Sequence, residues 1–115
     1  TMKAYLIHST DQAITTVDYE NVNDINKLIG SEVFCGAYPE NETGEILYVD
    51  DMGSFKDTMY FQIKGLPYLV AGNGLYVGPP TEDGSDSKPI ISIEELRKQV
   101  VFMTRRESLE LPLPF

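Results

Sequence analysis

The segment "YLVAGNGLYVG", residues 68–78, consists of two short apolar runs on either side of Gly72-Asn73-Gly74. Valine, leucine and tyrosine favour β-strands, and two glycines flanking an asparagine are typical of a turn or a bulge. The segment therefore predicts two short strands connected by this triplet. Upstream, "TMYFQIKG" (58–65) predicts a further strand, and downstream "PPTEDGSDSKP" (79–89) predicts an exposed, mobile polar loop.

Four more strands are predicted toward the N-terminus, in two adjacent pairs. Residues 3–9 ("KAYLIHS") and 12–19 ("QAITTVDY") are rich in β-branched and aromatic residues and are separated by a short turn, as in a β-hairpin. Residues 32–38 ("EVFCGAY") and 45–50 ("EILYVD") flank the turn "PENETG" and predict a second pair. Consecutive strands joined by tight turns indicate antiparallel pairing.

Two helices are predicted, one short and one C-terminal. The short helix spans about residues 22–29, with Asn21 as its N-cap and Gly30 ending it in the left-handed conformation. The C-terminal helix is predicted over residues 93–106, where Ser92 and a glutamate three residues later have the spacing of a capping box. The apolar residues at helical spacing are Val22, Ile25, Leu28 and Ile29 in the first helix and Ile93, Leu96, Val100 and Met103 in the second.

The order of the predicted elements is β-β-α-β-β-β-β-β-α. This order indicates an α+β fold with a mainly antiparallel sheet of about five to seven short strands, and with both helices on one face of the sheet. No internal repeat or linker divides the chain, so residues 2–106 are predicted to form a single domain. Residues 107–115 are predicted to form an extended, apolar C-terminal arm.

The arm ends in "LELPLPF", residues 109–115, where apolar side chains alternate with glutamate or proline. Pro112 and Pro114 exclude a helix, because proline lacks the backbone donor and has a fixed φ. An extended segment with one apolar edge can dock on its own domain, on a second copy or on a partner protein. We expect it to cross a homo-oligomer interface, with docking on its own domain as the alternative. The residues expected to be buried there are Leu109, Leu111, Leu113 and Phe115.

Charge is distributed unevenly along the chain. The 115 residues include 9 Lys and Arg against 18 Asp and Glu, for a formal net charge of −9. Residues 1–87 contain fourteen acids and four bases, whereas residues 88–115 contain four acids and five bases. This acidity argues against direct binding to nucleic acid or to a membrane surface, and no apolar run approaches the ~20 residues of a membrane span. The single cysteine indicates a reducing compartment, so a cytoplasmic location is predicted.

Patterns typical of catalytic or metal sites are sparse. Cys35 and His8 are the only cysteine and histidine, and both fall in predicted strands, where a buried thiol and a sheet-surface imidazole are the simpler interpretations. Asp50 and Asp51 have the oxygen ligands that hard metal ions prefer, but "DDMG" favours a turn with solvated carboxylates. We therefore expect no enzymatic activity, no metal and no cofactor.

A basic cluster near the C-terminus is the best candidate for a ligand site, because arginine binds phosphate through paired hydrogen bonds. The candidate phosphate contacts are Arg97, Lys98, Arg105 and Arg106. The candidates for stacking against a nucleobase are Tyr68 and Tyr76. The alternative interpretation is that each base complements the helix dipole or pairs with a nearby glutamate.

Several short motifs are spread over residues 2–103. They are "MKA" at 2–4, "YVDD" at 48–51, Gly65 with Pro67, Gly72 with Gly74, Gly78, and "IEEL" at 93–96 followed by Val100 and Phe102. With these motifs the chain resembles domain-of-unknown-function family 3846, found in phage and in plasmid or conjugative-element proteins of bacteria. The resemblance implies a mobile-element protein that acts inside a bacterial host cell. It implies no activity, because the family has no settled one.

Together these observations predict a small non-enzymatic phage or mobile-element protein that neutralises a host antiviral defence protein by stoichiometric binding. One alternative is an oligomeric sponge that sequesters a phosphorylated nucleotide immune signal. Another is a metal-dependent hydrolase that uses Asp50 and Asp51. The predicted partner is accordingly a host protein or a nucleotide signal molecule.

Overall fold

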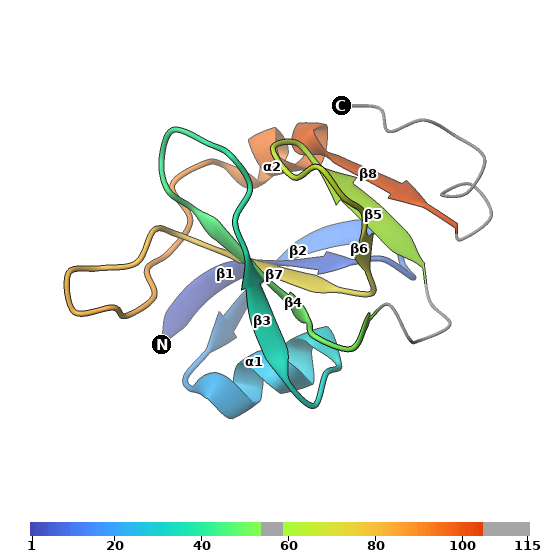
Figure 1. Ribbon diagram of the computed structural model, residues 1–115. Coiled ribbons are helices and arrows are strands. Elements are labelled where there is room, and N and C mark those ends of the chain that lie inside the picture. Colours follow the sequence, from blue (N-terminus) through green and yellow to red (C-terminus); the bar gives the residue numbers. More distant parts are fainter. Residues whose placement is uncertain (54–58, 105–115) are drawn as a thin grey trace.

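The structure, a computed structural model, describes residues 1–53 and 59–104. These residues form two helices and eight strands in the α+β arrangement that the sequence predicted (Figure 1). The elements are β1 (Met2–His8), β2 (Ala13–Tyr19), α1 (Val22–Ile29), β3 (Phe34–Ala37), β4 (Ile46–Asp50), β5 (Tyr60–Ile63), β6 (Val70–Ala71), β7 (Gly74–Val77), α2 (Ile93–Gln99) and β8 (Val100–Met103).

The strands are divided between two antiparallel sheets. The larger sheet has the order β2-β1-β7-β4-β3, and the smaller has the order β6-β5-β8. β1 and β2 form the predicted hairpin, paired over their whole length. β7 lies at the centre of the larger sheet, where Leu75 is in register with Leu6 of β1 on one side and with Tyr48 of β4 on the other. The central strand of this sheet is therefore the last of its five strands in chain order.

All four residues of β7 are buried. Because successive side chains of a strand point to opposite faces, both faces of the larger sheet must be covered at its centre. Leu75 and Val77 pack in one core with α1, whereas Tyr76 packs in the other with Phe61 of β5 and with α2. Figure 1 shows α1 on one side of the larger sheet and the smaller sheet with α2 on the other. The expectation that both helices cover the same face is wrong for this reason.

Gly72-Asn73-Gly74 connects the two sheets. The two short strands predicted around this triplet are present, but β6 belongs to the smaller sheet and β7 to the larger. Gly72 has a φ of +83°, a left-handed conformation that glycine adopts without steric cost. Asn73 Oδ1 accepts a hydrogen bond of 3.0 Å from the backbone N–H of Ser9, which fixes the connection to the end of β1.

Helix α1 has the predicted bounds and the predicted caps. Asn21 and Asp24 form a reciprocal capping box, and Gly30 ends the helix with a φ of 75°. Ile25 and Ile29 are the buried residues, and both pack against the larger sheet. Local capping signals and apolar spacing thus agree with the tertiary packing of this helix.

Helix α2 is shorter than predicted. It begins after Ser92, whose side chain accepts a hydrogen bond of 3.2 Å from the backbone N–H of Glu95, but it ends at Gln99 and not at residue 106. The next residues, Val100–Met103, form β8 and pair with β5. The prediction of a helix through residues 100–103 is wrong, because valine and phenylalanine favour a strand where an unpaired strand edge lies beside them.

The polar loop at 79–89 leaves the larger sheet and returns to it. Its tip is exposed, as predicted, over residues 80–85. The base of the loop closes where the backbone N–H of Gly78 donates to Ser87 O at 2.7 Å. A Cβ at Gly78 would lie 2.1 Å from the carbonyl oxygen of Lys88, so the returning chain passes too close for any side chain at this position.

Gly78→Ala is therefore expected to lower the free energy of unfolding by about 1–3 kcal/mol, because backbone must move to admit the methyl group. Urea unfolding followed by circular dichroism measures this change. The control is Glu82→Ala at the exposed tip of the same loop, expected to change stability by less than ~0.5 kcal/mol. Equal stability of the two variants would contradict the close approach at Gly78.

Candidate functional site

Arg97 lines an open groove between α2, β8 and the start of β2. Its Nη2 donates a hydrogen bond of 3.0 Å to the carbonyl oxygen of Ile14. The groove has a volume of about 420 Å³. A guanidinium carries five N–H donors, so the bond to Ile14 leaves donors for an anion. The other residues that line the groove are Gln12, Ala13, Ile14, Val100 and Phe102.

The structure does not gather the other predicted phosphate contacts around Arg97. Lys98 is exposed, and its Nζ lies 3.4 Å from Glu95 Oε1 in an i,i+3 pair. This arrangement matches the alternative interpretation, in which a base on the helix pairs with a neighbouring glutamate. Arg105 and Arg106 lie outside the described residues.

The two predicted stacking residues are apart from the groove. Tyr76 is only 2% exposed, in β7, with its ring centroid 6.5 Å from that of Tyr5. Such burial does not favour stacking on a nucleobase, and the role of Tyr76 as a stacking residue stays a prediction. Tyr68 is 50% exposed but does not line the groove. The aromatic residue beside Arg97 is instead Phe102, which the sequence placed on a helix.

The C-terminal arm, residues 107–115, lies outside the described residues. Its docking across a homo-oligomer interface or on its own domain stays a prediction. The residues concerned are Leu109, Leu111, Leu113 and Phe115.

Cys35 and His8 are far apart in the sheet. Cys35 is on β3 and His8 on β1, and β7 and β4 lie between these strands, which corresponds to roughly 14 Å at the usual strand spacing. Burial raises the pKa of the Cys35 thiol, and its hydrogen bond to the Asp51 carboxylate raises it further. His8 Nε2 lies 3.2 Å from Thr15 Oγ1. The two side chains do not form a nucleophile–base pair.

Asp50 is the last residue of β4, and Asp51 begins the turn that follows it. Asp50 Oδ1 accepts a hydrogen bond of 3.0 Å from the backbone N–H of Met52, which closes the turn. Over residues 1–53 and 59–104, no three His, Cys, Asp or Glu side chains are placed to hold a metal ion together.

Glu45 is a buried carboxylate that the sequence did not single out, with an exposed fraction of 1%. Its Oε2 accepts hydrogen bonds from the backbone N–H groups of Ile90 at 2.7 Å and Ile91 at 3.3 Å, and its Oε1 accepts one from the Thr43 hydroxyl at 2.6 Å. These bonds compensate for the loss of water around the charge. Burial and the Glu45 carboxylate together raise the pKa of Tyr76. Glu45 thus holds the segment before α2 against the larger sheet.

Asp86 holds the long polar loop in a similar way. Its Oδ2 accepts a hydrogen bond of 2.6 Å from the Tyr19 hydroxyl, and its Oδ1 accepts one from the Tyr48 hydroxyl. Burial and these hydrogen bonds raise the pKa of both tyrosines well above their usual range. One carboxylate therefore bridges β2 and β4 and joins the loop to them.

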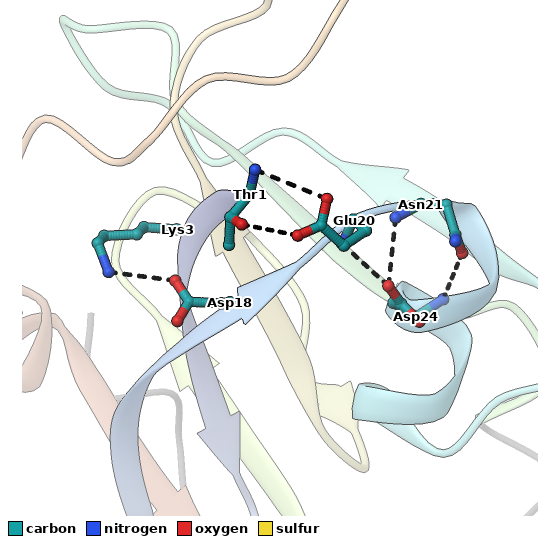
Figure 2. A network of polar contacts seen from close by, with 6 residues as sticks. All are labelled: Thr1, Lys3, Asp18, Glu20, Asn21 and Asp24. Carbon is teal, nitrogen blue, oxygen red and sulfur yellow. Dashed lines mark hydrogen bonds and ion pairs between the residues drawn. The ribbon is translucent and has the colours of Figure 1, made fainter.

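A surface network joins the N-terminus, the hairpin and α1. Figure 2 shows its members, Thr1, Lys3, Asp18, Glu20, Asn21 and Asp24. Lys3 Nζ lies 3.1 Å from Asp18 Oδ1, and the Asp24 carboxylate accepts a hydrogen bond of 2.9 Å from the backbone N–H of Glu20 (Figure 2). Exposed ion pairs of this kind contribute little to stability. Asp18 thus forms a cross-strand ion pair with Lys3, and Asp24 caps α1.

Acidic side chains outnumber basic ones in the described part of the chain. Three of the 18 acids and three of the 9 bases lie outside it, which leaves fifteen acids and six bases. Half of these six bases are engaged, Lys3 and Lys98 in ion pairs and Arg97 with a carbonyl oxygen. Neither described helix has the length and apolar character needed to cross a bilayer.

No family model, curated protein or solved structure matches this chain. The resemblance to domain-of-unknown-function family 3846 therefore stays a prediction.

Asp86→Ala is expected to lower the free energy of unfolding by about 1–3 kcal/mol, because it leaves the hydroxyls of Tyr19 and Tyr48 without their acceptor. Thermal and urea unfolding measure the loss. The control is Glu82→Ala, which removes an exposed carboxylate from the same loop. If Asp86→Ala were no more destabilising than this control, Asp86 would not anchor the loop.

Proposed function

We propose that this is a non-enzymatic phage or mobile-element protein that neutralises a host antiviral defence protein by binding it at fixed stoichiometry. The observation that carries the proposal is the excess of acids in the described residues, fifteen against six bases. Such a surface attracts a basic partner and increases the rate of their encounter.

The arrangement of the carboxylates of Glu45, which is buried, and Asp86, which is partly buried, supports a binding role. Asp86 and Glu45 fix the connection between β7 and α2 to the larger sheet through hydrogen bonds. A domain whose loops are already ordered loses less conformational entropy when it binds. Its surface is therefore suited to tight association with one partner.

The first test is dose dependence in bacteria that carry a single antiviral defence system and express this protein from a titratable promoter. Phage plating is expected to recover in proportion to the amount of protein and to level off once it is equimolar with the defence protein. The purified pair should elute as one complex, and its affinity should fall as ionic strength rises, because opposite charges are screened. Full protection at strongly substoichiometric amounts would contradict a binding mechanism.

A second candidate function is the sequestration of a phosphorylated nucleotide signal. It is favoured by one observation, that Arg97 and Phe102 line the same groove. Arginine suits the phosphates, and an aromatic ring suits the base.

Isothermal titration with cyclic and linear nucleotides tests this second function. Nucleotide binding is expected to be lost in Arg97→Ala and retained in Lys98→Ala, because Arg97 lines the groove and Lys98 does not. A ligand at 100 times its Kd should also stabilise the protein by about 2.7 kcal/mol. If no nucleotide binds, or if the two variants behave alike, the groove is not a nucleotide site.

A further inference from the structure

Strand β3 is an open edge of the larger sheet. It pairs with β4 on one side, and none of the described strands pairs with its other side. The backbone N–H of Asp51 donates to Val33 O at 3.1 Å, so these two residues are a hydrogen-bonded pair. Because such pairs alternate along an antiparallel ladder, Phe34 and Gly36 direct their N–H and C=O groups away from β4. An added strand would find two backbone donors and two acceptors there.

Exposed apolar side chains flank this edge. Val33 is 58% exposed before the strand, and Tyr38 is 71% exposed after it. A Cβ at Gly36 would lie 2.8 Å from the Tyr38 hydroxyl, so the Tyr38 side chain extends back along β3. A tyrosine ring presented in this way can pack on an incoming chain and can attract a cation to its face.

Acids outnumber bases around the edge, where exposed Lys64 lines a hollow together with Glu40 at the end of β3. Residues 28–53, which include β3 and β4, contain six acids and no lysine or arginine. Glu32 and Asp51 are exposed at one end of β3, and Glu40 is exposed at the other. A second copy of this chain would bring like charges together, which is unfavourable. An occupant with lysine or arginine side chains is complementary to both ends.

The opposite edge of the larger sheet differs. There, Arg97 donates to the carbonyl oxygen of Ile14 in β2, so a basic side chain already lies at this strand. The two outer strands of one sheet are therefore distinct: β2 has an arginine bound to it, whereas β3 has acids at both ends and no described strand on its outer side.

We propose that β3 binds an extended, lysine- or arginine-containing segment of a protein partner, which adds a strand to the larger sheet. Backbone hydrogen bonds to Phe34 and Gly36 would hold the segment, and Glu32, Asp51 and Glu40 would select its basic side chains. Strand addition of this kind combines main-chain affinity with side-chain specificity. The inference rests on the proposed function and specifies the partner-binding surface.

The probe is a short peptide of alternating lysine and valine, blocked at both ends, with the corresponding glutamate–valine peptide as its control. Nuclear magnetic resonance of the full chain should show shifts centred on the amides of Phe34 and Gly36, for the lysine peptide alone. Shifts centred on α1 or β2, or equal binding of the two peptides, would overturn the proposal.

Gly36→Pro and Gly36→Ala are a matched pair of variants. Both place a Cβ against the flexible end of Tyr38, but only proline removes the outward N–H, and proline is tolerated where an edge N–H faces solvent. Gly36→Pro is expected to weaken peptide binding at least about tenfold, because it removes a hydrogen bond and leaves a peptide carbonyl unpaired. Gly36→Ala should bind as the parent does. Equal binding of the two variants would exclude strand addition.

A second variant, Glu32→Lys with Glu40→Lys, covers the case in which Gly36→Pro fails to fold. It leaves the backbone groups in place and reverses the charge at both ends of the edge, so lysine-peptide binding should also fall at least about tenfold. Undiminished binding would contradict the charge argument. If the unmodified protein forms a dimer and Gly36→Pro disrupts it, the occupant of the β3 edge is a second copy of the chain. That outcome would contradict the proposal.

The same variants separate this inference from the proposed function. If Gly36→Pro still neutralises the defence protein, stoichiometric binding stands and the β3 edge is excluded as its surface. If the lysine peptide binds β3 but no defence protein is bound, the edge site stands and the proposed function fails.

Discussion

The structure depends on the burial of β7 on both of its faces. Its residues Gly74–Val77 are all buried, and the strand pairs with β1 on one side and β4 on the other. A sheet with such a centre is stable only if each face is covered, because its alternating apolar side chains would otherwise meet water. Helix α1 covers one face, and the smaller sheet with α2 covers the other (Figure 1). The left-handed Gly72 lets the chain pass from one layer to the other.

Two carboxylates, the buried Glu45 and the partly buried Asp86, organise the irregular parts of the fold. Glu45 accepts backbone and hydroxyl hydrogen bonds, and Asp86 accepts bonds from two tyrosines. A buried charge without such donors would be strongly destabilising, so each carboxylate requires its loop to adopt one conformation. Glu45 and Asp86 therefore have a structural role, while most of the other acids in the described residues are exposed and contribute to the negative charge.

The polar surface has two regions of different character. Arg97 connects α2 to β2 and lines the groove that supports the nucleotide hypothesis. The β3 edge is unpaired by any described strand and has an exposed Tyr38 and mainly acidic neighbours, which supports the protein-binding hypothesis. The two regions lie at opposite edges of one sheet and would select ligands of opposite charge.

The sequence by itself determined the elements whose signals are local. The caps and apolar spacing of α1, the β1–β2 hairpin and the strands around Gly72-Asn73-Gly74 were all predicted correctly. Of the candidate site residues, Arg97 lies in a groove and Tyr76 is buried, and their role in binding a ligand stays a prediction. Tertiary structure alone decided that Val100–Met103 form a strand and that the strands divide into two sheets. It also decided that Glu45 and Asp86 anchor the connection between β7 and α2. These features depend on partners distant in the chain, and residue periodicity carries no information about which distant edge or donor will be adjacent.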